Sequence, residues 1–461
     1  DLGEVYPGVR LSLHARGRNV EKVFVVAPGA DAGRIRLAIE GVERVRACEN
    51  GELALATALG EIRFTAPVAW QERDGARIPV AAAYAAEGCS YGFRLGPRDP
   101  GLPLIIDPLL ASTFVGGARD DFLQDMAVDG AGNVYVTGYT WSADFPVAGS
   151  PAQGAARGNT DVFVARLNSS LSRLAAATYL GGPYMDKGQA IAFSSNASAI
   201  YVAGEAGAGF PMTAGAYNTN FHAGSDWYVG DAFVARLNTN LSALSASTYL
   251  GGARGDGAVS LAVQPSGSDV AVAGWTASSD FPATAGAYDT SYNGGASGII
   301  DAFAAKFNST LSSLRAATYL GAPAYDYASD IALDAAGNLY VAGHTLSYNF
   351  PCTAGAYRTN YYGNANFYDG FVSKLSPALS ALSASTFLGG VNDDFIHALV
   401  LDPYGGVLVA GQTDSGDLPV SWGSYDRFLD GPTDAFLARL DTGLSELLAS
   451  TYLGGADTEE A

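Results

Sequence analysis

One short phrase recurs six times along this chain, and its spacing limits the possible folds more than any other feature. The copies are TFVGG, TYLGG, TYLGG, TYLGA, TFLGG and TYLGG, which begin at residues 113, 178, 248, 318, 386 and 451. Successive copies lie 65 to 70 residues apart. Self-similarity at a nearly fixed period is typical of repeat proteins, in which each repeat is one supersecondary unit.

Other blocks recur in the same order between these copies. An apolar strand and a tight turn are predicted by DMAVDGAGN at 125–133 and DIALDAAGN at 330–338, and an alternating strand follows in NVYVTGYT and NLYVAGHT. DFP and GAY motifs come next, and then a strand such as DVFVARLN from residue 161. Four short strands per interval, with no helical period, predict an all-β chain: a β-propeller of about five four-stranded blades.

These ordered blocks resemble the SBBP β-propeller repeats of bacterial extracellular proteins over about residues 111–461. The preceding region, from VYPGVRLSLHARGRNVEKVFVV to PLIIDPLL, resembles the small β-rich domain of unknown function that often precedes such repeats. We therefore expect an N-terminal β-rich domain at 1–108, whose start lies before Asp1, and propeller repeats at 109–461. The resemblance implies export and a role at the cell surface or in the matrix, and it supplies no catalytic residues.

Charge and composition exclude several classes of partner. The net charge is −20, of which residues 1–110 carry almost none, with 13 Lys and Arg against 14 Asp and Glu. A nucleic-acid partner is not expected, because phosphate binding needs a basic surface. No membrane insertion is expected either, since no stretch approaches the roughly 20 apolar residues of a spanning helix. We expect a secreted protein whose signal sequence is not present in this chain.

The three cysteines leave two interpretations open. In an exported protein Cys48 and Cys89 could form a disulfide, while Cys352 has no obvious partner. Alternatively, all three are small buried or loop residues.

An acidic residue stands four positions after each glycine pair of the recurring phrase. A ring of such carboxylates would suit Ca²⁺, which prefers oxygen ligands. The alternative, which we favour, is that each carboxylate binds backbone amides in the turn between blades, because no dense calcium-loop spacing occurs. The residues concerned are Asp121, Asp186, Asp256, Asp326, Asp394 and Glu459.

A second acidic set opens the third strand of each unit, and a basic residue follows five positions later. The odd spacing places the two side chains on opposite faces of the strand, so we expect them to contact neighbouring strands or blades rather than each other. The aspartates are Asp161, Asp231, Asp301, Asp369 and Asp434.

One position varies within an otherwise constant second strand. We expect such variation only where side chains reach solvent, a groove or a partner. A mixed aromatic and polar lining for a ligand or a neighbouring subunit is one interpretation; neutral change at an exposed site is the other, which we favour. The residues are Tyr139, Glu205, Trp275, His344 and Gln412.

No catalytic constellation stands out, because repeated carboxylates suit architecture better than distinct acid and base roles. We predict a non-enzymatic structural or adhesive protein of a bacterial surface or extracellular assembly. Six copies of the last-strand phrase against five of the other blocks leave one strand over, so self-association into an oligomer or filament is expected. The alternatives are a monomeric propeller that binds an extracellular glycan or surface protein, and a polysaccharide-degrading enzyme.

Overall fold

The computed structural model is built almost entirely from β-strands, as predicted. It describes the chain except residues 1–2, 17–18, 40, 49–50, 52, 58–59, 65, 74–75, 108–112, 170, 172, 223–229, 295–298, 364–365, 457 and 459–461. The chain divides into two compact units, residues 1–114 with 170–173 and residues 115–169 with 174–461. No helix in the described ranges is long and apolar enough to cross a membrane.

The first unit contains three antiparallel sheets, in the orders β1-β2-β3-β12-β8-β9, β10-β11-β4 and β5-β6-β7. Its strands are β1 (Glu4–Tyr6), β2 (Val9–Arg16), β3 (Asn19–Val26), β4 (Leu37–Ala38), β5 (Arg44–Ala47), β6 (Leu53–Thr57), β7 (Gly60–Phe64), β8 (Val68–Arg73), β9 (Ala76–Val80), β10 (Ala82–Glu87), β11 (Ser90–Leu95) and β12 (Leu104–Asp107), with one 3-10 turn, η1 (Ala32–Arg34). Tyr84, Tyr91 and Phe93 form the aromatic centre of its core, with rings packed edge to face or tilted. Cys48 and Cys89 in this unit, and Cys352 in the second, are free thiols.

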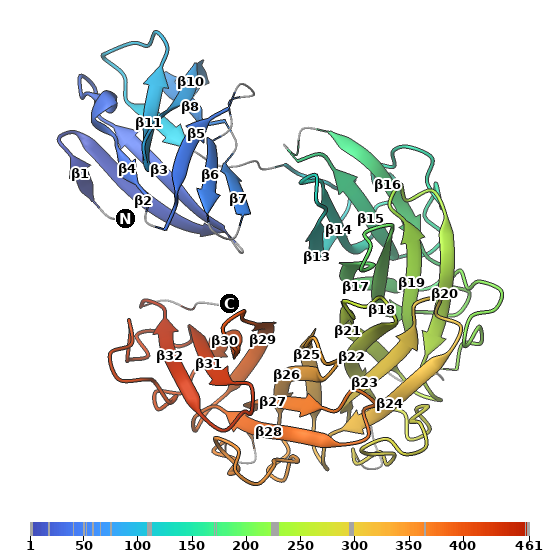
Figure 1. Ribbon diagram of the computed structural model, residues 1–461. Helices are drawn as coiled ribbons and strands as arrows, with labels where there is room; N and C mark the ends of the chain where they lie inside the picture. The colour runs from blue at the N-terminus through green and yellow to red at the C-terminus, as the bar shows by residue number, and fades with distance from the viewer. Residues whose placement is uncertain are drawn as a thin grey trace. The chain divides into compact units, whose positions relative to one another are not determined.

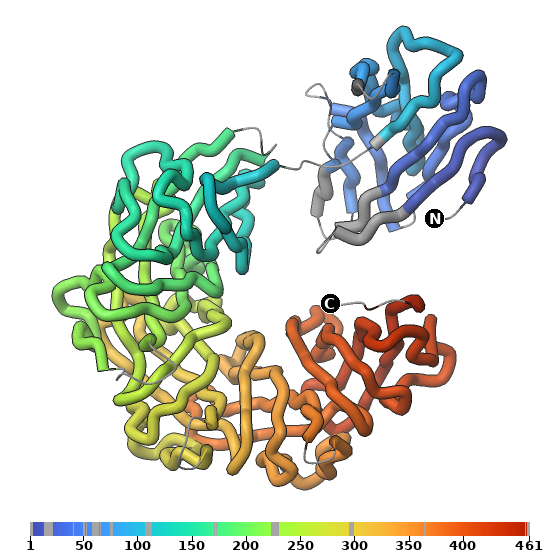
Figure 2. Tube along the Cα trace, turned by 180° about the vertical axis from the view of Figure 1, so that it is seen from behind, coloured from blue at the N-terminus to red at the C-terminus, as the bar shows by residue number. Residues whose placement is uncertain are grey.

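The second unit contains five four-stranded antiparallel sheets, each made of strands consecutive in sequence, which follow one another in chain order (Figures 1 and 2). Blade 1 comprises β13 (Asp121–Val128), β14 (Val134–Thr140), β15 (Asp161–Leu167) and β16 (Leu174–Leu180). Blade 2 comprises β17 (Asp186–Phe193), β18 (Ala199–Ala206), β19 (Asp231–Asn238) and β20 (Leu244–Leu250). Blade 3 comprises β21 (Asp256–Val263), β22 (Asp269–Thr276), β23 (Asp301–Asn308) and β24 (Leu314–Leu320). Blade 4 comprises β25 (Asp326–Leu333), β26 (Leu339–Thr345), β27 (Asp369–Leu375) and β28 (Leu382–Leu388). Blade 5 comprises β29 (Asp394–Leu401), β30 (Gly406–Thr413), β31 (Asp434–Asp441) and β32 (Leu447–Leu453).

The recurring phrase forms the fourth strand of each blade, which explains why its aromatic residue recurs. In blade 2, Tyr249 lies directly opposite Phe233 of the third strand and is 1% exposed. Its hydroxyl donates to the Gly207 carbonyl at 2.7 Å, so one side chain both fills the core and fixes the loop after the second strand. Equivalent tyrosine hydroxyls bind that loop in blades 1, 3 and 5, through Tyr179, Tyr319 and Tyr452.

Neighbouring blades share apolar cores through their first strands. Each first strand packs against the next, in the series β13, β17, β21, β25 and β29. Between blades 1 and 2, Val164 of β15 and Ile191 of β17 belong to one buried cluster, and the Ile191 amide donates to Asp125 Oδ2 at 2.8 Å. Stacking therefore buries sheet faces that no single blade could bury, as expected of a propeller.

Candidate functional site

The first candidate is the set of aspartates that open the first strands, and the structure shows what their carboxylates bind. In blade 3, Asp256 is fully buried and its Oδ2 accepts the Gly252 amide at 2.8 Å. The Thr276 hydroxyl donates to Oδ1, and the Ser278 hydroxyl donates to Oδ2 at 2.9 Å. The carboxylate thus ties the turn from the preceding blade to the end of the second strand.

The amide bond recurs in every blade, and both hydroxyl contacts of Asp256 recur in blades 1 and 4. In blade 5 the Ser415 hydroxyl donates to Asp394 Oδ2 at 2.9 Å. The corresponding amide bonds to Asp121, Asp186, Asp326 and Asp394 are 2.6 to 2.7 Å long. In blade 2 the threonine is replaced by Ala206, and the Gly207 amide donates to Asp186 Oδ1 at 2.9 Å instead. The favoured interpretation, that each aspartate binds backbone amides between blades, describes these contacts.

Burial shifts the acidity of these carboxyl groups strongly. It raises the pKa of Asp256 and Asp326 to about 8, and that of Asp186 and Asp394 to about 7, because desolvation disfavours the charged form. The hydrogen bonds that each carboxylate accepts act in the opposite direction but do not cancel the effect of burial.

The second acidic set lies beside the first at the blade junctions. Asp231 accepts the His222 amide at 2.8 Å, and its charge adds to the raised pKa of Asp256 in the next blade. A Cβ on Gly251 would lie 2.5 Å from Asp256 Oδ2 and 3.1 Å from Asp231 Cγ. Glycine is therefore required in the phrase because the turn passes between two carboxyl groups.

The basic residues that follow this second set bind elsewhere, as their spacing predicted. Lys306 donates to the Gly337 and Pro377 carbonyls at 2.7 and 2.8 Å, which places its charge against the next blade. Arg439 pairs with Asp402 at 2.6 Å.

The carboxylates of the described residues do not come together as one metal site. Within the described residues, no three His, Cys, Asp or Glu side chains form a group that could hold a metal ion. Glu459, the last member of the expected ring, lies outside those residues. Binding of Ca²⁺ stays a prediction.

The second candidate is the variable position of the second strand, and here the structure corrects the sequence-based expectation. Trp275 is only 7% exposed, so variation at this position does not require exposure. Tyr139, Glu205, His344 and Gln412 are half-buried. Each of the five residues lies directly opposite a first-strand residue, in the pairs Phe122–Tyr139, Lys187–Glu205, Gly257–Trp275, Tyr327–His344 and Phe395–Gln412.

In three of these pairs the opposite residues complement each other in size or charge. Tyr139 stacks on Phe122 with ring centroids 4.9 Å apart, and Glu205 pairs with Lys187 at 3.6 Å. Trp275 faces a glycine, whose missing side chain leaves room for the indole. In these three pairs the facing side chains therefore fit each other across the two strands.

The layer formed by these pairs is continuous across blades 4 and 5. His344 stacks on Tyr327 at 5.1 Å and meets Phe395 of blade 5 edge to face at 4.8 Å. Burial lowers the pKa of His344 to about 3, so the ring is neutral. His397 lies within hydrogen-bonding distance of Gln412 Oε1, at 3.3 Å. These side chains thus contact one another across the two blades.

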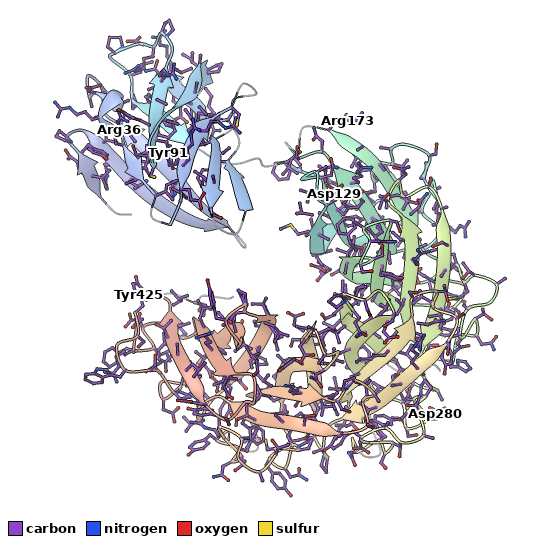
Figure 3. All side chains as sticks on the ribbon, viewed as in Figure 1. Arg36, Tyr91, Asp129, Arg173, Asp280 and Tyr425 are labelled. Atoms are coloured by element: carbon purple, nitrogen blue, oxygen red, sulfur yellow. The ribbon has the colours of Figure 1, made fainter. Side chains whose placement is uncertain are left out.

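The sequence did not predict a third feature, a backbone hydrogen bond from the loop after the second strand of one blade to the turn between the third and fourth strands of the next blade. We call this bond the clip. The Tyr288 amide donates to the Leu379 carbonyl at 2.8 Å, and Leu379 has a left-handed φ of 52°. Equivalent bonds join Ala152 to Leu241, Tyr217 to Leu311 and Tyr357 to Leu444. The recurring GAY motif, whose tyrosine amide donates this bond in blades 2 to 4, is the sequence signal that could have predicted it. Tyr425, the corresponding residue of blade 5, is 87% exposed and projects from the loop before β31 (Figure 3).

Family models match both parts of the chain. A domain of unknown function, DUF7948, matches residues 1–109, and the β-propeller repeat SBBP matches residues 112–146 and 317–351. This chain carries SBBP β-propeller repeats. The expected resemblance is thereby confirmed for the SBBP repeats and for the domain that precedes them.

Solved structures share only a distant likeness with the SBBP repeat chain. The tricorn protease is 10% identical with a TM-score of 0.33, over 95% of this chain and 44% of that one, so the chain spans less than half of that protein. Quinohemoprotein alcohol dehydrogenase from Comamonas testosteroni is 10% identical (92% and 69% covered, TM-score 0.37), and a eukaryotic initiation factor is 9% identical (96% and 96%, TM-score 0.27). No curated protein matches the sequence.

Proposed function

We propose that this protein is a non-enzymatic structural or adhesive component of a bacterial cell surface or extracellular assembly. The observation that carries the proposal is the use of the repeated carboxylates. The first-strand aspartates bind turn amides and neighbouring hydroxyls, as Asp256 does with Gly252 and Ser278, so they hold blades together instead of facing a substrate. An acid and a base with separate roles, which hydrolysis would require, do not emerge from so uniform a set.

An exposed aromatic loop on blade 5 supports the adhesive part of the proposal. Trp422 is 92% exposed and Phe428 is 71% exposed, and the Arg427 guanidinium lies 5.3 Å from the centre of the Trp422 ring. Blades 2 to 4 have alanine where blade 5 has Trp422, at residues 214, 285 and 354. Large exposed aromatic side chains are typical of surfaces that contact another macromolecule.

Electron microscopy of native and recombinant protein, together with light scattering, tests the structural role. Each sample is measured with Ca²⁺ and with a chelator. Fibres or large oligomers support the proposal, and their loss on chelation would show that Ca²⁺ takes part. A monomer under every condition contradicts self-assembly and leaves adhesion to a different molecule as the surviving form of the proposal.

A second candidate, a monomeric propeller that binds a glycan or surface protein, is favoured by the same loop. An indole with a guanidinium beside it offers a stacking face and hydrogen-bond donors for a sugar ring. Binding to a glycan panel is measured for the native chain, for Trp422→Ala and for Trp141→Ala, which removes another exposed indole from blade 1. Loss of binding in Trp422→Ala alone supports this candidate. Turnover of any glycan on the panel would contradict the non-enzymatic assignment.

A further inference from the structure

Blade 5 has large side chains at three loop positions where blades 2 to 4 have small or polar ones. Relative to the tyrosine of the GAY motif, here Tyr425, the three residues are Trp422 three positions before it, Arg427 two after and Phe428 three after. The corresponding residues of the other blades are Ala214, Thr219 and Asn220; Ala285, Thr290 and Ser291; and Ala354, Thr359 and Asn360. All of them are exposed, so the exposure of Trp422 and Phe428 is a property of this loop in every one of these blades.

The backbone of blade 5 holds Trp422 outward. The Ser424 amide donates to the Ser421 carbonyl at 3.2 Å, and Gly423 has a left-handed φ of 80°, so residues 421–424 form a tight turn. Trp422 lies in the middle of this turn and is 92% exposed. The Arg427 guanidinium lies 5.3 Å from the centre of its ring, so an indole and a cation are presented together.

A second pair of the same kind lies on the corresponding loop of blade 4. The Arg358 guanidinium is 4.1 Å from the centre of the Tyr362 ring, and Tyr362 is 48% exposed. The Tyr362 amide donates to Asp369 Oδ2 at 2.8 Å, and the Arg358 amide donates to Thr386 Oγ1 at 2.9 Å. These bonds fix the backbone at both residues, and a further bond from the guanidinium to the Gly389 carbonyl orients the cation.

The two loops lie against each other. Tyr357, the residue before Arg358, packs against the same buried cluster as Val420 and Leu429, which flank residues 422–428 of blade 5. Both arginine–aromatic pairs therefore belong to one junction. We call this set the arginine–aromatic surface; it consists of Arg358, Tyr362, Trp422, Arg427 and Phe428.

The charge of the arginine–aromatic surface differs from that of the whole chain. The net charge of the protein is −20, yet neither Arg358 nor Arg427 forms a salt bridge with a carboxylate of the described residues. Asp426, the acid before Arg427, accepts the Phe428 amide at 3.2 Å and is therefore occupied within the loop. Two guanidinium groups beside exposed aromatic rings are thus available to an anionic ligand.

The two kinds of side chain select for different parts of a ligand. A guanidinium binds a carboxylate or sulfate through charge-assisted hydrogen bonds, and an exposed aromatic ring stacks on the flat apolar face of a sugar ring. A neutral glycan would leave both arginines without a counter-charge, and an acidic peptide would leave the rings without flat partners. The repetition of the pair on adjacent loops suits a polymer that repeats the same unit.

We propose that the arginine–aromatic surface binds an anionic polysaccharide, a chain of sugars that carries carboxylates or sulfates. The sugar rings stack on Trp422 and Tyr362, and the anionic groups pair with Arg427 and Arg358. The inference rests on the second candidate function, glycan binding, and names the class of glycan.

Matched polymers separate the contribution of charge from that of the sugar. Affinity is measured for polygalacturonate and for the same polymer after methyl esterification, which removes the charge and keeps the rings. Dextran sulfate and dextran form a second pair, which distinguishes sulfate from carboxylate as the bound group. Polyglutamate supplies carboxylates without sugar rings.

The variants are chosen to change one component at a time. Arg427→Gln and Arg358→Gln remove the cations, and Trp422→Ala removes a ring. Tyr362→Ala tests the blade 4 pair independently, should Arg358→Gln fail to fold for lack of its bond to Gly389. Arg315→Gln is the control, because its guanidinium is 55% exposed but pairs with Asp269 in blade 3.

We expect the native chain to bind at least one charged polysaccharide, and to bind its uncharged counterpart and polyglutamate at least about tenfold more weakly. Arg427→Gln, Arg358→Gln and Trp422→Ala should each lower the affinity by about tenfold, and Arg315→Gln should leave it unchanged. Equal affinity for charged and uncharged polysaccharides overturns the inference but leaves glycan binding intact if Trp422→Ala still abolishes it. Equal affinity for polyglutamate, or equal losses in Arg315→Gln and Arg427→Gln, also overturns it, because charge alone then explains binding. Absence of binding to all the charged polymers overturns it as well, and the glycan panel then decides separately whether the second candidate function survives.

Discussion

Gly257 lies directly opposite Trp275 in blade 3, and a Cβ on this glycine would lie 2.6 Å from Trp275 Nε1. The absence of a side chain on one strand is therefore what allows the largest side chain on the next. Gly257→Val should lower the free energy of unfolding by about 1–3 kcal/mol, the usual cost of overpacking. Urea unfolding measures this value.

The matched control is the double variant Gly257→Val with Trp275→Ala. If the two residues are coupled by the steric fit, the double variant should be more stable than the sum of the two single changes predicts. Simple additivity would show that Trp275 has space to move and that the pairing does not explain the variation at this position.

Stability should fall as the pH rises from about 4 to 8. Burial raises the pKa of Asp256 and Asp326 to about 8 in the folded protein, well above the value of 3.8 for a free aspartate. The folded state therefore binds more protons than the unfolded state in this range, and the free energy of unfolding decreases with increasing pH. Thermal unfolding at pH 5, 6, 7 and 8 should give a steadily decreasing Tm. Asp256→Asn should weaken this dependence, and a Tm that rises over the same range would contradict it.

Chelation should leave the Tm unchanged if the first-strand aspartates serve only the turns. In blade 3 both carboxylate oxygens of Asp256 already accept hydrogen bonds, from Gly252, Thr276 and Ser278. Calorimetry with Ca²⁺ and with a chelator measures the difference. A Tm that drops on chelation in the native chain but not in Asp256→Asn would place a bound cation at this junction.

The architecture could be predicted from the sequence because its determinants are local. Alternation in segments such as NLYVAGHT and the spacing of the TYLGG phrase define strands whatever lies beside them. The pairing of Trp275 with Gly257 could not be predicted, because it depends on register across a bulge between Ala258 and Ser260. The burial of Asp256 could not be predicted either. An aspartate that follows a glycine turn has the same sequence pattern whether its side chain is exposed or buried.

The leucine that accepts the clip hydrogen bond should contribute to stability where the preceding blade donates that bond. Leu311 is fully buried, its carbonyl accepts the Tyr217 amide at 2.9 Å, and its φ is 56°. Leu171 is also a leucine with a left-handed φ, of 51°. It lies between β15 and β16 of blade 1, and no described blade precedes blade 1. We expect Leu311→Ala to cost about 2–5 kcal/mol and Leu171→Ala roughly 1 kcal/mol or less. Equal losses would mean that the leucine stabilises its own turn and not the contact between blades.

Phe114 and Phe387 occupy the same position of the recurring phrase, and they should differ in what they contribute to stability. Phe387 is 1% exposed, lies opposite Phe371 and belongs to the core shared by blades 3 and 4, so Phe387→Ala should cost about 3–5 kcal/mol. Phe114 is 102% exposed, so Phe114→Ala should change the free energy of unfolding by about 0.5 kcal/mol at most. Urea unfolding of the two variants, each compared with the native 461-residue chain, measures both values. Because the residue type and the repeat position are the same, the difference isolates the presence of a sheet. A large loss in Phe114→Ala would show that residues 113–117 make packing contacts in solution and would contradict the expectation.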